Sequence, residues 1–399
     1  MQPPAAGAGS LERGFPASPL YIDRVRPCLE SGNRGFGQES KGENIMKKKT
    51  VLSVVLFLFV LLPFVISAVA EENDPFKKSL HYTTHGMAFW YDAEDGFSAI
   101  TGVPYKELGC KNCHVSSCND CHLEETENGY KFSATKARQS ETCLKCHARE
   151  KATIGIDRQR NFDSVHMSIM NCSDCHSSRE IHGDGKHYDS MRAPGAMDTK
   201  CENCHTKDAV EYPPVPESRS HMIHKDNLAC NACHVQNTMA CYNCHFGVLQ
   251  ETGKKSESFT GKVKDFFLLV KYDGKVTSGT LQTLVGKDNY PFITYVPYFT
   301  HSVTREGRKC EQCHNTDAVK IMSKGEIFSP AGFGTESGFY EGVIPVAPDL
   351  LNWPFYEKKN GKWVAFEPEN KPLVQLGVYA EPLTKAELKK MNMPFKYEK

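Results

Sequence analysis

The residues of this chain that could do chemistry are cysteines and histidines in a repeated arrangement. Of its 17 cysteines, 16 form pairs separated by two residues, and a histidine directly follows every pair. The eight Cys-x-x-Cys-His motifs are Cys110/Cys113/His114, Cys118/Cys121/His122, Cys143/Cys146/His147, Cys172/Cys175/His176, Cys201/Cys204/His205, Cys230/Cys233/His234, Cys241/Cys244/His245 and Cys310/Cys313/His314. Random placement of the 16 histidines would give this result with a probability of roughly 10⁻¹¹.

This spacing is that of covalent haem attachment. Two thiols three positions apart form thioethers to the two vinyl groups of one porphyrin, and the adjacent imidazole reaches the iron as its proximal ligand. A zinc site or a redox disulfide uses Cys-x-x-Cys without a fixed histidine after it. The sequence therefore predicts eight haem c groups and a protein that moves electrons.

The histidines outside the motifs are candidates for the sixth ligand of each iron. A haem iron that already holds one imidazole commonly takes another as its distal ligand. The chain has eight such histidines, one for each haem: His81, His85, His166, His182, His187, His221, His224 and His301. Sequence order alone leaves open which of them faces which iron.

The first 70 residues have the pattern of an export signal behind an extension. Residues 46–70 begin with Met46 and three lysines, continue with an apolar run, and end in Ala68-Val69-Ala70. We expect cleavage near Ala70 and a periplasmic or extracellular protein; the alternative is an uncleaved anchor helix. Residues 1–45 are polar and rich in Pro and Gly, and we interpret them as a misplaced gene start ahead of Met46.

Charge excludes one class of partner. The formal net charge is +0, and the propionates of eight haems would make the exported protein acidic. Such a surface does not favour nucleic acid. We expect a small-molecule electron acceptor instead, with a periplasmic or membrane quinol-linked cytochrome as the electron donor.

The spacing of the motifs predicts the fold class. After residue 70 there are about 41 residues per haem, too few to bury a side-chain core around each one. We expect a mainly α protein with much irregular structure, in which the haems themselves form the core of a multihaem cytochrome c fold. Residues 71–248 form a predicted heptahaem domain, and residues 249–399 a C-terminal region with the eighth haem.

The C-terminal third differs from the rest by its turn signals. Phe266–Val270, Asp273-Gly274 and residues 275–284 indicate a β-hairpin, and Asn360-Gly361 indicates a second one. Thr384 with Glu387 predicts a capping box at the start of a short helix. Residues 315–399 carry no motif, and we interpret them as a wrap or as a contact in a homo-oligomer.

Beyond the motifs, the chain resembles the octahaem tetrathionate reductases, which are related to hydroxylamine oxidoreductases and multihaem nitrite reductases. The likeness runs from about residue 77 to about residue 333. It is carried by His81-x-x-x-His85-Gly86-Met87 with Trp90-Tyr91, Cys110-Lys-Asn-Cys113-His114-Val115, Cys241-Tyr-Asn-Cys244-His245-Phe246, and Phe266–Val270.

The resemblance implies an active site at the second haem. Its iron would hold His122 and a lysine amine, with Lys136 as first candidate and Lys131 as second. It also implies that a calcium ion lies near the active haem. Because one distal histidine is then in excess, it would serve as an acid or proton donor near the substrate; His85, His182 and His187 are the candidates.

Two functions follow as hypotheses. The first is an oxidoreductase that reduces tetrathionate, nitrite or hydroxylamine at the second haem, with Lys136, His122 and His85 as catalytic residues. The second is an electron-transfer conduit in which every iron holds two imidazoles and no substrate binds. Equal numbers of haems and spare histidines favour the conduit, and the family resemblance favours the enzyme.

Overall fold

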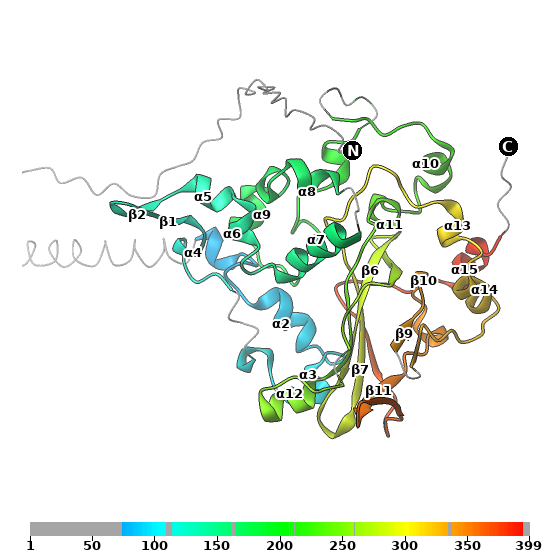
Figure 1. Cartoon of the computed structure of the whole chain (residues 1–399). Coiled ribbons are helices and arrows are strands. Elements are labelled where there is room, and N and C mark those ends of the chain that lie inside the picture. The colour runs from blue at the N-terminus through cyan, green and yellow to red at the C-terminus, as the bar shows by residue number, and fades with distance from the viewer. Residues whose placement is uncertain are drawn as a thin grey trace, which may run out of the picture. The chain divides into compact units, whose positions relative to one another are not determined.

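The computed structural model describes residues 74–108, 114–160, 164–206, 208, 210, 212–258, 260–333 and 337–393 (Figure 1). The predicted extension, the predicted export signal, and Cys110 and Cys113 of the first motif lie outside these residues. Residues Ala68–Lys399 form one of two units, and the other, Met1–Ser67, is not described. Within the described ranges, no helix is both long enough and apolar enough to cross a membrane.

The part of the chain that holds the first six motifs consists of short elements joined by loops. Only α7, Ala148–Arg160, exceeds seven residues. The others are η1 Pro75–Lys78, α2 His85–Tyr91, α3 Ser98–Thr101, η2 Tyr105–Glu107, α4 Asn119–His122, β1 Leu123–Thr126, β2 Gly129–Phe132, α5 Ala134–Arg138, α6 Ser140–Cys143, α8 Val165–Ile169, η4 Cys172–Asp174, α9 Ser178–His182, η5 Cys201–Asn203, α10 Arg219–His224 and α11 Cys230–His234.

Almost no apolar side chain is buried between residues 114 and 227 of this part. Among the described residues from 114 to 227, the buried apolar ones are Ile156 and Ala196. A segment of this length normally needs many buried apolar groups to offset the entropy of ordering its backbone. The small number of buried apolar side chains is what we expect if groups other than side chains supply the core of this segment.

A seven-stranded sheet carries the side-chain core. Its strands are β3 Ala240–His245, β4 Gly261–Val263, β5 Phe266–Tyr272, β6 Lys275–Val285, β7 Pro291–Pro297, β10 Gly342–Pro345 and β13 Leu373–Leu376. The order is β10-β5-β6-β3-β4, with β7 beside β6 and β13 beside β7. The pairs β5–β6, β6–β7 and β3–β4 are antiparallel, whereas β10–β5, β3–β6 and β13–β7 are parallel.

Both predicted hairpins and the predicted terminal helix are present. The turn of β5–β6 has Asp273 at φ 50° and Gly274 at φ 72°, the left-handed pair that a two-residue hairpin turn needs. Asn360 and Gly361 form the same left-handed pair in the turn between β11, Phe355–Lys359, and β12, Lys362–Phe366. Thr384 and Glu387 form a reciprocal capping box at α15, Lys385–Met391.

The extent of the sheet was not predicted. The β5–β6 hairpin is its centre, and strands from distant parts of the chain are added to it. Residues after 315 contribute β10 and β13, and α14, Asp317–Ser323, packs against α15 beside it. The remaining elements are α12 Phe246–Thr252, η6 Lys287–Asn289, α13 Cys310–Cys313, β8 Ala331–Phe333, β9 Ser337–Phe339 and η7 Pro348–Leu350.

The two predicted regions are joined by strand pairing and by hydrogen bonds of a partly buried arginine. The expected boundary at residue 248 falls inside α12, and β3, which bears the seventh motif, pairs with β6. From α7, the Arg149 guanidinium donates to the Met239 carbonyl at 2.8 Å and to the Thr280 hydroxyl at 3.0 Å. The motif-bearing segment is therefore anchored to the centre of the sheet.

Candidate metal centres

Twelve of the 16 histidines face one another in six pairs. In every pair one ring belongs to a Cys-x-x-Cys-His motif and the other is one of the spare histidines. The ring centroids are 5.9–6.2 Å apart in His122/His182, His147/His81, His176/His301, His205/His166, His234/His221 and His314/His224. The structure thus shows which spare histidine faces the motif histidine in each of these six motifs.

The spacing within the pairs fits a metal ion held between two rings. A metal–imidazole bond is about 2 Å long and a ring nitrogen lies about 1.1 Å from the ring centre, so two rings on opposite sides of one ion have centroids about 6.2 Å apart. Direct stacking of two rings would bring them closer. Burial also lowers the pKa of His81, His122 and His166, with the facing ring adding to the shift, which favours the neutral form that binds metal.

The second nitrogen of the paired rings gives an independent test. Metal-bound histidines usually donate their other ring N–H to a carbonyl or carboxylate. In eight paired rings Nδ1 lies 2.7–3.0 Å from an oxygen, which leaves Nε2 for the facing side. These are His176, His182, His205, His221, His224, His234, His301 and His314. The twelve residues therefore fit six irons, each held by a proximal and a distal imidazole.

At the second motif the facing group is an imidazole and not the expected amine. His182, at the end of α9, lies opposite His122 with a centroid distance of 6.1 Å. The Lys136 amine donates to Gln139 at 3.0 Å, and the Lys131 amine is paired with Glu124 at 3.4 Å. Phe132 stacks on the His122 ring at 4.3 Å. The lysine ligand stays a prediction from the resemblance, while the geometry favours His182.

The fourth motif has a carboxylate behind each ring. His176 Nδ1 donates to Glu180 at 2.8 Å, and His301 Nδ1 donates to Glu150 at 2.7 Å. Burial acts to raise the pKa of both carboxyls, but the hydrogen bonds that they accept outweigh it and hold each pKa below its usual value. The hydrogen bond that His301 donates to Glu150 also raises the pKa of His301.

Unlike the six motifs with paired rings, the first and seventh motifs have no second imidazole facing the motif histidine among the described residues. His114 lies against the backbone of Thr83 and His81, with no imidazole facing it among the described residues. His245 Nε2, the atom that would hold iron, instead donates to the Tyr356 carbonyl at 2.9 Å, and Phe366 lies 6.4 Å from the ring. The arrangement at the seventh motif therefore does not fit an iron on His245.

Two of the spare histidines lie outside the six pairs. His85 Nε2 donates to Asp189 at 2.9 Å, with both side chains 45% exposed. His187 is exposed. His114 packs on the backbone of residues 81–83, and His85 follows this segment in the sequence. His85, which donates to Asp189, is therefore close in sequence to the backbone that His114 contacts.

Cysteines of successive motifs lie side by side. A hydrogen bond between thiols raises the pKa of Cys143 and lowers that of Cys172 to about 5, and Cys201 and Cys230 form a second such pair with about 7 for Cys230. Electrostatic contacts join Cys121 with Cys146, Cys175 with Cys204, and Cys233 with Cys310 and Cys313. These contacts place motifs two, three, four, five, six and eight in one continuous line.

The described cysteines are all available for covalent attachment. None of the fourteen in motifs two to eight forms a disulfide. An internal disulfide within any of these motifs would have removed both thiols from haem attachment. No disulfide therefore blocks thioether formation at any of these seven motifs.

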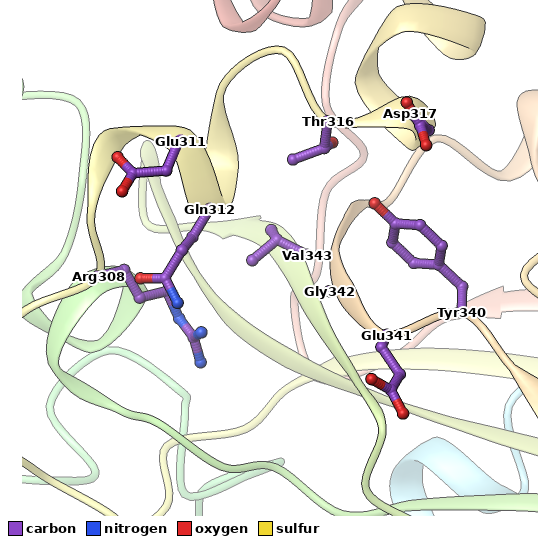
Figure 2. A pocket seen from close by; sticks show the side chains of 9 residues that line it. All are labelled: Arg308, Glu311, Gln312, Thr316, Asp317, Tyr340, Glu341, Gly342 and Val343. Atoms are coloured by element: carbon purple, nitrogen blue, oxygen red, sulfur yellow. The ribbon is translucent and has the colours of Figure 1, made fainter.

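A pocket of about 390 Å³ lies beside the eighth motif (Figure 2). Arg308 and Gln312 are on one side of it and Tyr340 is on the other. The Arg308 guanidinium is engaged with the carbonyls of Val235 and Gln236 and with the Phe267 ring. Within the described ranges, no group of three His, Cys, Asp or Glu side chains could hold a further ion such as calcium.

Comparisons of the chain with models of protein families, with curated proteins and with solved structures give no match. The resemblance to octahaem tetrathionate reductases therefore stays an expectation from the motifs. Sequence reasoning identified all twelve paired histidines but not Glu150 and Glu180. Glu180 follows His176 by four residues, a spacing that could have pointed to it, whereas Glu150 has no local signal.

Proposed function

We propose that the chain is a multihaem electron-transfer cytochrome in which six irons each hold two imidazoles. The observation that carries this proposal is the set of six ring pairs, each of one motif histidine and one spare histidine at 5.9–6.2 Å. Haem with two axial imidazoles supplies reversible one-electron chemistry and leaves no coordination position for a substrate. The residues of the chain hold the rings in place, since Nδ1 of eight of them is fixed by hydrogen bonds.

The line of neighbouring cysteines supports transfer along the chain. Cysteines of motifs two to six each interact with those of the following motif, except that motif six interacts with motif eight, so the attached groups would also be neighbours. Short distances between carriers are what rapid electron transfer requires. The expected donor is a periplasmic or membrane quinol-linked cytochrome, and the expected location is the periplasm or the cell exterior.

A second candidate function is reduction of tetrathionate, nitrite or hydroxylamine. The observation that favours it is that His114 has no facing imidazole among the described residues, so a substrate position would lie at the first motif. At the first motif, His85 with its partner Asp189 would be placed to deliver protons. The geometry at the second motif gives this function no support, because His182 takes the position opposite His122.

The experiment that tests the proposal combines attachment with turnover. The exported protein would be digested, and each Cys-x-x-Cys-His peptide examined by mass spectrometry for covalent haem. The same preparation would be assayed with reduced viologen and each of the three substrates. Haem on the six motifs with paired imidazoles without turnover supports the conduit, and turnover supports the reductase. Free thiols in the peptides of motifs two to six or of motif eight contradict both.

A further inference from the structure

The six ring pairs differ in the charge of the groups behind them. His182, His205, His221, His224, His234 and His314 direct Nδ1 toward neutral oxygens of hydroxyl or backbone carbonyl groups. At the fourth motif both rings donate to carboxylates, His176 to Glu180 and His301 to Glu150. Among the six pairs in the described part of the chain, no other has a carboxylate hydrogen-bonded to Nδ1 of both rings.

Glu180 is held rigidly against His176. Its side chain is 1% exposed, and it accepts hydrogen bonds from the backbone of Asp198 and from the backbone and hydroxyl of Thr199. These donors orient the carboxylate so that Oε2 remains on the His176 ring at 2.8 Å. Asp198 is itself fixed by Arg179, which clamps the loop that covers Glu180.

Hydrogen bonds also hold Glu150 against the other ring of the pair, His301. Its side chain is 15% exposed, and the Tyr298 hydroxyl donates to Oε1 at 2.7 Å while His301 donates to Oε2 at the same distance. Glu150 lies in the first turn of α7, directly after the third motif. Residues from three distant segments, α7, α9 and the loop after β7, therefore converge on one centre.

A carboxylate behind a ligand ring changes the electronics of the metal. When Nδ1–H is shared with a carboxylate, the imidazole gains anionic character and becomes a stronger donor, which stabilises ferric over ferrous iron. The two negative charges act in the same direction at short range in a buried site. Arg192 interacts electrostatically with Glu150, Glu180 and His301, and its single positive charge is smaller than the two negative charges together.

Resting on the function proposed above, we propose that the haem of the fourth motif has the lowest reduction potential of the six with paired imidazoles, because Glu150 and Glu180 accept the Nδ1 protons of both its ligands. The contacts of Cys172 with Cys143 and of Cys175 with Cys204 put this haem between the third and the fifth. It separates an electron pool on the second and third haems from a pool on the fifth, sixth and eighth. Glu150 and Glu180 are positioning residues that set this step.

The test is a redox titration of the haem-loaded protein, followed by optical and electron paramagnetic resonance spectra, with Glu180→Gln and Glu150→Gln variants. Gln keeps the size and a carbonyl acceptor but removes the charge. The lowest-potential component should move to higher potential in each variant, further in the double variant, with the other components unchanged. Glu326→Gln is the control, since Glu326 is an exposed carboxylate after α14, outside every Cys-x-x-Cys-His motif.

Two failures are distinguishable. If the fourth motif carries haem and the lowest-potential component is unmoved in both single variants, the inference is overturned while the proposed function stands. If mass spectrometry finds Cys172 and Cys175 of the wild-type protein without haem, the proposed function fails together with the inference. Because Glu150 and Glu180 lie in different elements, misfolding of one variant leaves the other to decide the result.

Discussion

The imidazoles of His176 and His301 face each other with centroids 6.1 Å apart and ring planes 65° apart, although they come from distant parts of the chain. His81 and His147 have a similar angle of 61°. In the other four pairs the angle is 12–36°. The six centres thus fall into two geometric classes.

These classes predict two kinds of low-spin ferric signal. Ring planes that are nearly parallel split the iron d orbitals strongly and give rhombic spectra, whereas steeply crossed planes give a highly anisotropic signal. Electron paramagnetic resonance of the oxidised protein should show two irons of the anisotropic kind and at least four of the rhombic kind. Spectra with only rhombic signals would contradict the ring geometry at His176 and His81.

Removal of a distal ring should affect one haem only. In a His182→Ala variant, the iron of the second motif should change from low-spin to high-spin and should bind carbon monoxide after reduction. A Lys136→Ala variant is the matched control, and it should leave all spectra unchanged because the Lys136 amine lies on Gln139. The reverse outcome, with Lys136→Ala converting one haem and His182→Ala none, would favour the reductase type of ligand.

The identity of the candidate ligands could be predicted from the sequence, whereas the way in which they pair could not. All proximal residues follow from the motifs, and the spare histidines follow from counting. The pairing of His301 with His176 does not, because it depends on how the loop after β7 meets the motif-bearing segment. The same applies to Glu150, whose contact with His301 joins α7 to that loop.

The sheet was underestimated for a related reason. The hairpins at Asp273-Gly274 and Asn360-Gly361 are encoded locally by their turn residues, and they could be predicted. Strands β4, β10 and β13 have only three or four residues, and β10 and β13 gain their partners from segments far away in the chain. Such short strands have no periodicity that distinguishes them from loops.

Gly279 should be intolerant of a side chain. A Cβ at this position, in the centre of β6, would lie 2.8 Å from Val270 Cγ1. A Gly279→Ala variant should lose about 1–3 kcal/mol of unfolding free energy in urea denaturation. Gly155 in α7 has open space around it, so Gly155→Ala should gain about 0.5–1 kcal/mol. Equal effects of the two substitutions would contradict the packing of β5 on β6.

Glu387 should make the stability of α15 depend on pH. It accepts hydrogen bonds from the backbone and hydroxyl of Thr384 and lies 3.4 Å from the Lys271 amine. Burial acts to raise its pKa, but these contacts outweigh it and hold the pKa below the usual glutamate value. A depressed pKa in the folded state means that this stabilisation is present above the unfolded pKa of about 4.3 and is lost as pH falls through the folded value.

The Glu387→Gln variant gives the measurement for this prediction. At pH 7 it should be less stable than the wild type by about 0.3–1 kcal/mol, because Gln can still form the capping box but loses the charge that interacts favourably with the helix N-terminus. The difference should narrow when thermal unfolding is repeated at pH values below 4. A difference that stays constant between pH 7 and pH 3 would contradict a role of the Glu387 carboxylate in capping α15.

The central claim is that six irons in this chain each hold two imidazoles. Near-infrared magnetic circular dichroism of the fully oxidised, haem-loaded protein tests it most directly, because the charge-transfer band of a low-spin haem identifies its axial ligand pair. We predict a bis-imidazole band whose intensity corresponds to at least six haems per chain. An intensity corresponding to fewer than six, or a dominant band from histidine–amine or histidine–thioether ligation, would contradict the account.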